Sequence, residues 1–162
     1  MGRRAFGKFD ILQILIIAAL VAFMIIMLVS GNAKDVPMEE IKAVMTEKTN
    51  VTELTEKTVN DAAGVFAFDH NAVEEGIYYR VDDVMNVNEL LILKIPDDNS
   101  REAAMEAVQT YLDEKKESFN GYGTNQYGLL SNAILTEKGP YLFFGVSEDV
   151  LQWESEFLGC VR

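Results

Sequence analysis

The feature that most constrains this chain is the stretch that begins at Ile11 and ends at Val29, nineteen residues in which Gln13 is the only polar side chain. At about 1.5 Å per residue, a helix of this length reaches roughly 28 Å, close to the thickness of the hydrocarbon core of a bilayer. Thirteen of the nineteen residues are Leu, Ile, Phe or Val. Together they favour insertion by about 4 to 8 kcal/mol before the cost of Gln13. The stretch therefore predicts a transmembrane helix in contact with membrane lipid.

The charges beside this stretch predict its orientation. Arg3, Arg4 and Lys8 precede it with one acidic residue, Asp10, whereas residues 30–35 carry one positive and one negative charge. Short flanks rich in Lys and Arg stay in the cytoplasm. We therefore expect four parts: a cytoplasmic basic tail (1–10), a single span (11–29), a linker (30–36) and an extracytoplasmic domain (37–162) held at the cell membrane.

The same N-terminal segment is also compatible with a cleaved secretory signal. Gly31 and Ala33 are small residues with the spacing that signal peptidase requires, so cleavage after Ala33 is an open alternative. Nineteen apolar residues exceed the roughly 7 to 15 of a usual signal core, and we therefore expect a retained signal anchor. No cysteine directly follows the stretch, which excludes lipoprotein processing. Both alternatives place the domain outside the cytoplasm.

Residues 36–162 are strongly acidic. They contain ten Lys or Arg and 24 Asp or Glu, a net charge of −14. Such a surface repels phosphates, so we expect no nucleic acid partner. The length suits one domain with its own hydrophobic core. The single cysteine, Cys160, excludes an internal disulfide, and we expect a partly buried free thiol near a helix end, with pairing between two chains as the alternative.

Hydrophobic periodicity predicts an α+β domain. We expect a helical pair, then two β-β-α units that form a mainly antiparallel four-stranded sheet with helices on one face. Start and stop signals predict the following elements: a helix from Pro37 to about Lys48, a helix capped by Asn50 and closed by Gly64, strands over 76–82 and 90–95, a helix over 101–118, an ordered loop over 120–125, strands over 132–137 and 141–146, and a helix capped by Ser147 that ends at Gly159.

The sequence carries no pattern that predicts a metal or cofactor site. His70 is the only histidine, which excludes a metal site built from several imidazoles. The acidic residues at 82–83 and 97–98 lack the alternating spacing of a calcium loop, so we interpret them as turn and cap residues. No nucleotide-binding or serine hydrolase motif occurs. We therefore expect no cofactor, and we identify no catalytic residue.

Two sets of side chains leave a functional role open. Glu74 with Glu75, and Glu154 with Glu156, would serve a glycosidase only if folding set two carboxylates across a cleft, and solvated helix faces are the simpler interpretation. The aromatic residues Phe119, Tyr122, Tyr127, Tyr141 and Trp153 form the second set. Tyr122 lies within a glycine-rich segment and Tyr127 follows it, and we consider both weak candidates for contact with a glycan or peptide, because a flat ring with a polar tip supplies area and a hydrogen bond. A structural role is the alternative that we favour for Tyr122, with its ring packed under the sheet or a helix.

Several short motifs occur in an order that is similar to a known family. They are Leu91-Ile92-Leu93-Lys94, Phe119-x-x-Tyr122, Gln126-Tyr127-x-x-Leu130-x-Asn132 and Gly139-x-Tyr141. From about Ile41 to Leu158 the chain resembles the family called domain of unknown function 4358, which contains membrane-anchored or lipoprotein extracytoplasmic domains of Gram-positive, clostridia-type bacteria. Thr124 and Pro140 depart from the residues usual in that family. The resemblance implies no activity and no site residues.

These observations favour a single-pass, membrane-anchored, extracytoplasmic protein that acts as a non-enzymatic binding or envelope-associated module. Its expected partners are membrane lipid, through the span, and an envelope protein or glycan. The alternative is a cell-wall-directed hydrolase that uses a carboxylate pair.

Overall fold

The computed structural model describes residues 16–17, 20–21 and 33–162. The chain divides into two compact units, Met1–Asn32 and Ala33–Arg162. All but four residues of the predicted span lie outside the described residues, and those four are helical and exposed: Ile16, Ile17, Leu20 and Val21. No helix within the described residues combines the length and apolar character needed to cross a membrane.

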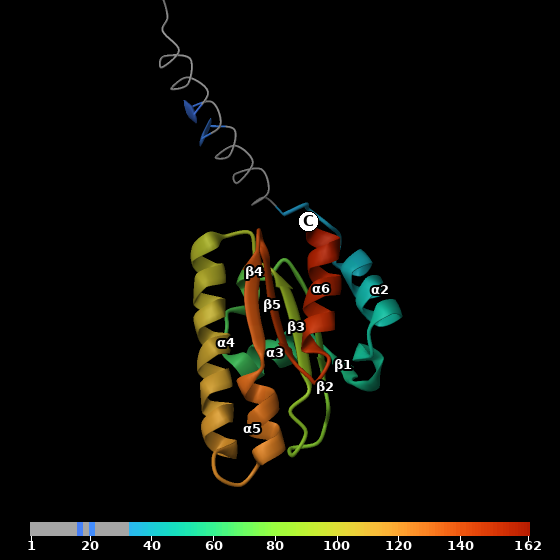
Figure 1. Cartoon of the computed structure of the whole chain (residues 1–162), viewed down its shortest axis with the longest axis vertical. Helices are drawn as coiled ribbons and strands as arrows, with labels where there is room; N and C mark the ends of the chain where they lie inside the picture. The colour runs from blue at the N-terminus through green and yellow to red at the C-terminus, as the bar shows by residue number, and fades with distance from the viewer. Residues whose placement is uncertain (1–15, 18–19, 22–32) are drawn as a thin grey trace, which may run out of the picture. The chain divides into compact units, whose positions relative to one another are not determined.

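A five-stranded antiparallel sheet forms the centre of the second unit (Figure 1). Its order is β1-β2-β3-β5-β4. The strands are β1 (Thr55–Lys57), β2 (Glu75–Arg80), β3 (Glu89–Lys94), β4 (Ile134–Lys138) and β5 (Tyr141–Val146). The α+β class is confirmed, but the prediction of four strands is wrong. Sequence reasoning missed β1 because its three residues are polar and show no apolar alternation.

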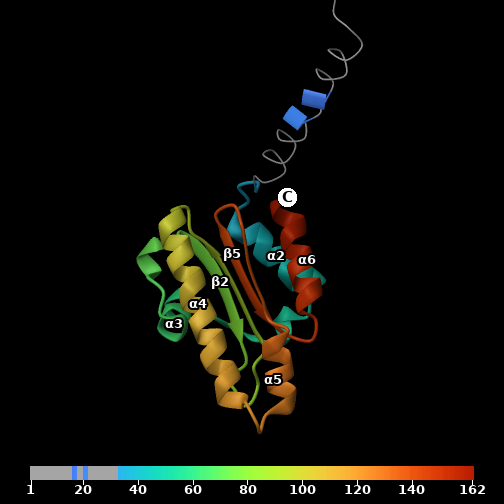
Figure 2. The same cartoon turned by 60° about the vertical axis from the view of Figure 1, so that its left-hand side comes forward.

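Helices cover both faces of the sheet. They are α2 (Met38–Lys48), α3 (Val59–Phe66), α4 (Asp98–Phe119), α5 (Thr124–Ser131) and α6 (Val150–Val161), with 3-10 turns η1 (Val51–Glu53) and η2 (His70–Ala72). Residues of α3 and α4 belong to one core cluster and residues of α2 and α6 to the other. Figure 2 shows the sheet between these two layers. The prediction that helices pack on one face only is therefore wrong.

The composition of the inner strands explains the two layers. In β3, Leu91 and Leu93 pack with α3 and α4, whereas Leu90 and Ile92 pack with α2 and α6. All four side chains are fully buried. Successive side chains of a strand point to opposite faces, so a strand that is apolar at every position needs cover on both. β5 follows the same rule, because all six of its residues are buried.

The predicted second helix is replaced by three shorter elements. Residues 50–64 contain η1, then β1, and then the start of α3. The helix cap is Thr58, whose hydroxyl accepts a bond from the Asp61 amide at 3.1 Å while the Asp61 carboxylate accepts from the Thr58 amide at 2.9 Å. This reciprocal capping box fixes the helix start. The helix continues past Gly64 and ends at Phe66, followed by Ala67 with φ of 62°.

The remaining predicted helices and strands are present, most of them with shifted ends, and β5 has the predicted bounds. Pro37 precedes α2 as expected. Asp97 caps α4 through its carboxylate, which accepts from the Ser100 amide at 2.8 Å. The last helix begins at Val150, three residues after Ser147, and continues past Gly159.

Candidate functional site

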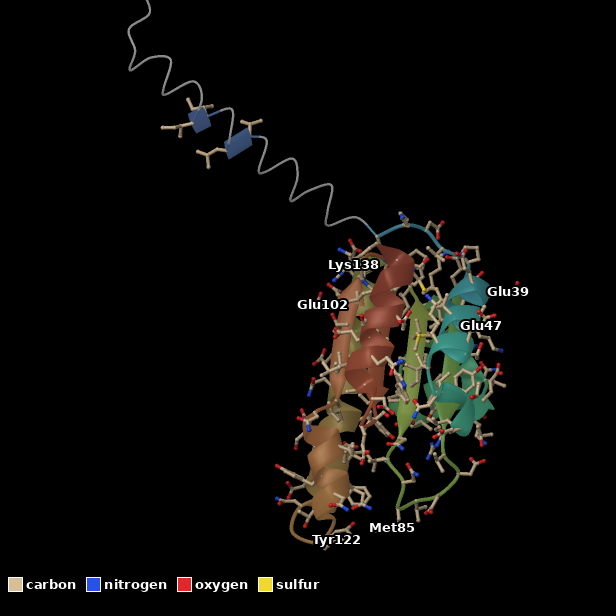
Figure 3. The ribbon with its side chains drawn as sticks, turned by 45° about the vertical axis from the view of Figure 1, so that its right-hand side comes forward. Glu39, Glu47, Met85, Glu102, Tyr122 and Lys138 are labelled. Atoms are coloured by element: carbon tan, nitrogen blue, oxygen red, sulfur yellow. The ribbon has the colours of Figure 1, made fainter. Side chains whose placement is uncertain are left out.

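One end of the domain gathers two connecting segments. Residues 81–88 join β2 to β3, and residues 120–123 join α4 to α5. Gln126 Nε2 donates a hydrogen bond to the Met85 carbonyl at 3.0 Å and ties the two together. We call residues 81–88 and 120–127 the tip. Figure 3 labels Tyr122 and Met85 at this end. Ala33 lies at the opposite end, next to Gly139 of the β4–β5 turn.

The tip carries four exposed large apolar side chains. Val84 is 83% exposed, Tyr122 68%, Met85 49% and Tyr127 42%. The ring centroid of Tyr122 lies 5.7 Å from that of Phe119, which is buried. The ring of Tyr122 therefore rests against the end of α4 and remains open to solvent. The expectation that it packs under the sheet or a helix is wrong.

The local sequence explains why the chain turns sharply here. Gly121 has φ of +91°, a conformation that side chains disfavour. A Cβ atom placed on Gly123 would lie 2.5 Å from Phe119 Cδ1, so only glycine fits against that ring. The helix α5 then begins at Thr124. The predicted loop over 120–125 is thus shorter than expected, and Tyr127 projects from a helix.

A cavity of about 330 Å³ opens beside the tip. Residues of the 81–88 segment line one side, Asn125, Gln126 and Leu129 of α5 another, and Glu148 a third. Most of these side chains are polar. The cavity therefore offers hydrogen-bonding groups together with Met85, Val87 and Leu129, a composition that suits a polar ligand with apolar parts.

A buried carboxyl group lies just inside the tip. Glu89 is 5% exposed, and its carboxylate accepts hydrogen bonds from the hydroxyls of Tyr78 and, at 2.8 Å, Tyr111. Burial raises the pKa of Glu89, and the two hydroxyl donors and the charge of Arg80 oppose that rise. These contacts join β2, β3 and α4.

The space around Glu89 is too small for an organic substrate. A cavity of about 10 Å³ lies there, lined in part by Asn88, Glu89 and Lys115. This volume is about that of one water molecule. The Oδ1 atom of Asn88 is buried and has no hydrogen-bond partner among the described residues. A single water in this cavity would satisfy Asn88, and we interpret the Glu89 cluster as structural.

Three of the four carboxylates considered for hydrolase chemistry have local partners. Glu74 lies 3.5 Å from Lys94 Nζ, and Glu75 accepts from the Met38 amide at 3.0 Å. Glu156 lies 3.4 Å from Lys48 Nζ. In the part of the chain that the structure describes, no group of three or more His, Cys, Asp or Glu side chains is placed to hold a metal ion.

The other aromatic candidates and the cysteine are packed in the domain. Tyr141 and Trp153 are fully buried, and Trp153 Nε1 donates to Asn50 Oδ1 at 2.9 Å. Cys160 is a half-buried free thiol in the last turn of α6, as expected, and burial raises its pKa.

The fold and the tip define a class of small α+β domains, with an antiparallel sheet enclosed by two helical layers and an exposed aromatic end. The chain belongs to the family described as Domain of unknown function (DUF4358), whose model matches residues 38–147. The match runs from the start of α2 through β5 and includes the tip, so the resemblance noted in the sequence is confirmed. Comparison with curated proteins gave no match, and neither did comparison with solved structures.

Proposed function

We propose that this protein is a membrane-anchored, extracytoplasmic binding module that contacts an envelope protein or glycan through its tip. The anchor is supported by the apolar stretch from Ile11 to Val29, and the outward orientation by Arg3, Arg4 and Lys8. The binding role is supported by the fold, because the tip lies at the opposite end of the domain from Ala33, where the chain enters it.

The exposed tip carries the proposal. Four large, exposed apolar side chains gather at one end of the 130-residue unit, and exposed apolar groups mark contact sites when polar residues surround them. Tyr122 and Tyr127 are the types of residue enriched where proteins bind partners. Loops fixed by a rigid scaffold often bear such contacts.

The surroundings of the carboxylates favour this module over a wall hydrolase. A glycosidase needs two carboxyl groups across an accessible cleft, one of them protonated at working pH. Glu89 has a raised pKa, but its cavity holds no more than about one water molecule. Both faces of the sheet are covered by helices.

Site-specific photocrosslinking in intact cells tests the binding role. A photoreactive phenylalanine analogue replaces Tyr122 or Tyr127, and Glu102, exposed on α4, serves as the matched control position. We expect a discrete product from the tip positions that is absent at position 102. Digestion with protease or muramidase then distinguishes a protein from a wall glycan. Products that are identical at all three positions, or absent at both tip positions, would contradict the proposal.

Removal of the Tyr122 ring distinguishes a residue that contacts a partner from one that stabilises the fold. Tyr122→Ala should change the free energy of unfolding by less than about 0.5 kcal/mol, because the ring is mostly exposed. Phe119→Ala, in contact with it but buried, should cost about 3 kcal/mol or more. Urea unfolding of both variants measures the difference. Equal losses would show that Tyr122 is structural.

A further inference from the structure

Half of one edge of the sheet has no strand beside it. The edge strand β1 has three residues, and its pairing with β2 ends at Lys57 opposite Tyr78. In the described part of the chain, no strand pairs with Glu75, Gly76 or Ile77 on that side, although all three pair with β3 on the other. An unpaired edge presents backbone N–H and C=O groups that accept a further strand.

An open cavity of about 480 Å³ lies along this free edge. The first turns of α2 form one wall through Pro37, Met38, Glu39 and Lys42. Glu56 of β1 and residues 75–77 of β2 form the other. A segment that continues the sheet past β1 would therefore enter a space already flanked by a helix. Three residues of such a segment span about 10 Å.

The charged side chains that line the cavity indicate which kind of peptide segment would bind there. Three carboxylates and one ammonium line it. Lys42 forms an ion pair with Glu56, because Lys42 Nζ lies 2.5 Å from Glu56 Oε1. Glu75 accepts a bond from the Met38 amide, and neither Glu75 nor Glu39 forms an ion pair within the described residues. Two carboxylates without an ion pair of their own thus line the cavity, Glu39 from α2 and Glu75 from β2.

We propose that residues 75–77 of β2 bind an extended, cationic peptide segment of another protein as an added strand. The backbone of β2 supplies the pairing, and Glu39 and Glu75 select lysine or arginine. Side chains of a strand alternate between faces, so only every second residue of the segment meets these carboxylates. The net charge of −14 on residues 36–162 attracts such a segment from a distance.

A labelled hexapeptide of alternating lysine and valine is the probe. Fluorescence anisotropy measures its binding to the full chain in non-ionic detergent, beside a peptide with glutamate in place of lysine and a lysine peptide with N-methylated backbone amides. We expect binding of the first peptide only, weakened by added salt. Absence of binding by the first peptide, or equal binding of any two, would overturn the proposal.

A pair of matched variants locates the site. Glu39→Gln with Glu75→Gln removes the two carboxylates and keeps a side-chain acceptor for the Met38 amide, and we expect about fivefold weaker binding or more. Glu102→Gln with Glu114→Gln removes the same charge from α4; Figure 3 labels Glu39 and Glu102 in separate parts of the domain. Equal weakening by both double variants would show that binding depends only on the net charge of the domain, and would overturn the proposed site. A dimer of the full chain that dissociates only in the first double variant would assign the edge to a second copy and also overturn it.

Discussion

At the scale of single residues, Glu89 is the most unusual side chain of the described domain. Its carboxyl group is buried between β2, β3 and α4, and burial raises its pKa above the ordinary value. The unfolded chain therefore releases this proton at a lower pH than the folded chain does. Between the two pKa values the folded state binds more protons, so the contribution of Glu89 to stability falls as pH rises.

Glu89→Gln should remove this pH dependence. Glutamine does not titrate, so the variant should gain stability relative to the wild-type protein as pH rises from about 4 to 7, and the two should differ least at the acidic end. Urea unfolding of the full chain in detergent at a series of pH values measures the difference. If the wild-type protein instead gains stability relative to the variant as pH rises, the hydrogen bonds from Tyr78 and Tyr111 lower the pKa of Glu89 more than burial raises it.

Sequence reasoning identified part of the tip at this scale. Tyr122 and Tyr127 could be selected because they flank glycines and asparagines, which indicate a surface segment. The exposure of Tyr122 could not be predicted, since it depends on the contact between Gly123 and Phe119. Val84 and Met85 were missed, because apolar residues in a turn give no signal until the chain around them is placed.

At the scale of elements, Gly123 sets the junction between α4 and α5. A Cβ atom there would lie 2.5 Å from Phe119 Cδ1 and 3.2 Å from Gln126 Oε1. Gly123→Ala should therefore destabilise the domain by about 1 to 3 kcal/mol, because the buried Phe119 ring must move. Thermal or urea unfolding of the purified variant measures the loss.

Gly128 supplies the matched control on the same helix. Apart from the adjacent residues and the backbone of its own helix, no heavy atom lies within 4 Å of its Cβ position. Gly128→Ala should stabilise the protein by about 0.5 to 1 kcal/mol, because alanine restricts the unfolded chain and suits a helix interior. A loss at position 128 that equals the loss at 123 would show that α5 is not helical in solution.

Elements were predicted where their apolar pattern is strong. β2, β3, β5 and α4 repeat apolar residues at strand or helix spacing and were placed within about three residues of their ends. β1 is polar, and α5 contains a central glycine, so neither produces such a pattern. For α3, we expected a cap at Asn50, but the reciprocal bonds of Thr58 and Asp61 define its start.

At the scale of the whole molecule, the two helical layers follow from the composition of the inner strands. All six residues of β5 and five of the six residues of β3 are buried, which requires cover on both faces. That signal was present in the sequence, because Leu90 to Ile95 is apolar apart from Lys94, although we expected helices on one face only. Which helices cover which face of the sheet could not be predicted. Trp153 and Ile41, for example, share a core cluster only because segments distant in the sequence come into contact.

The proposed position of the domain outside the cell membrane is tested most directly by cysteine labelling. In a Cys160→Ser background, Glu102→Cys places a thiol on the exposed surface of α4 and Gly7→Cys places one in the basic tail. A membrane-impermeant maleimide added to intact cells should label the protein at position 102, and at position 7 only after permeabilisation. Labelling at position 102 only after permeabilisation would contradict the extracytoplasmic assignment.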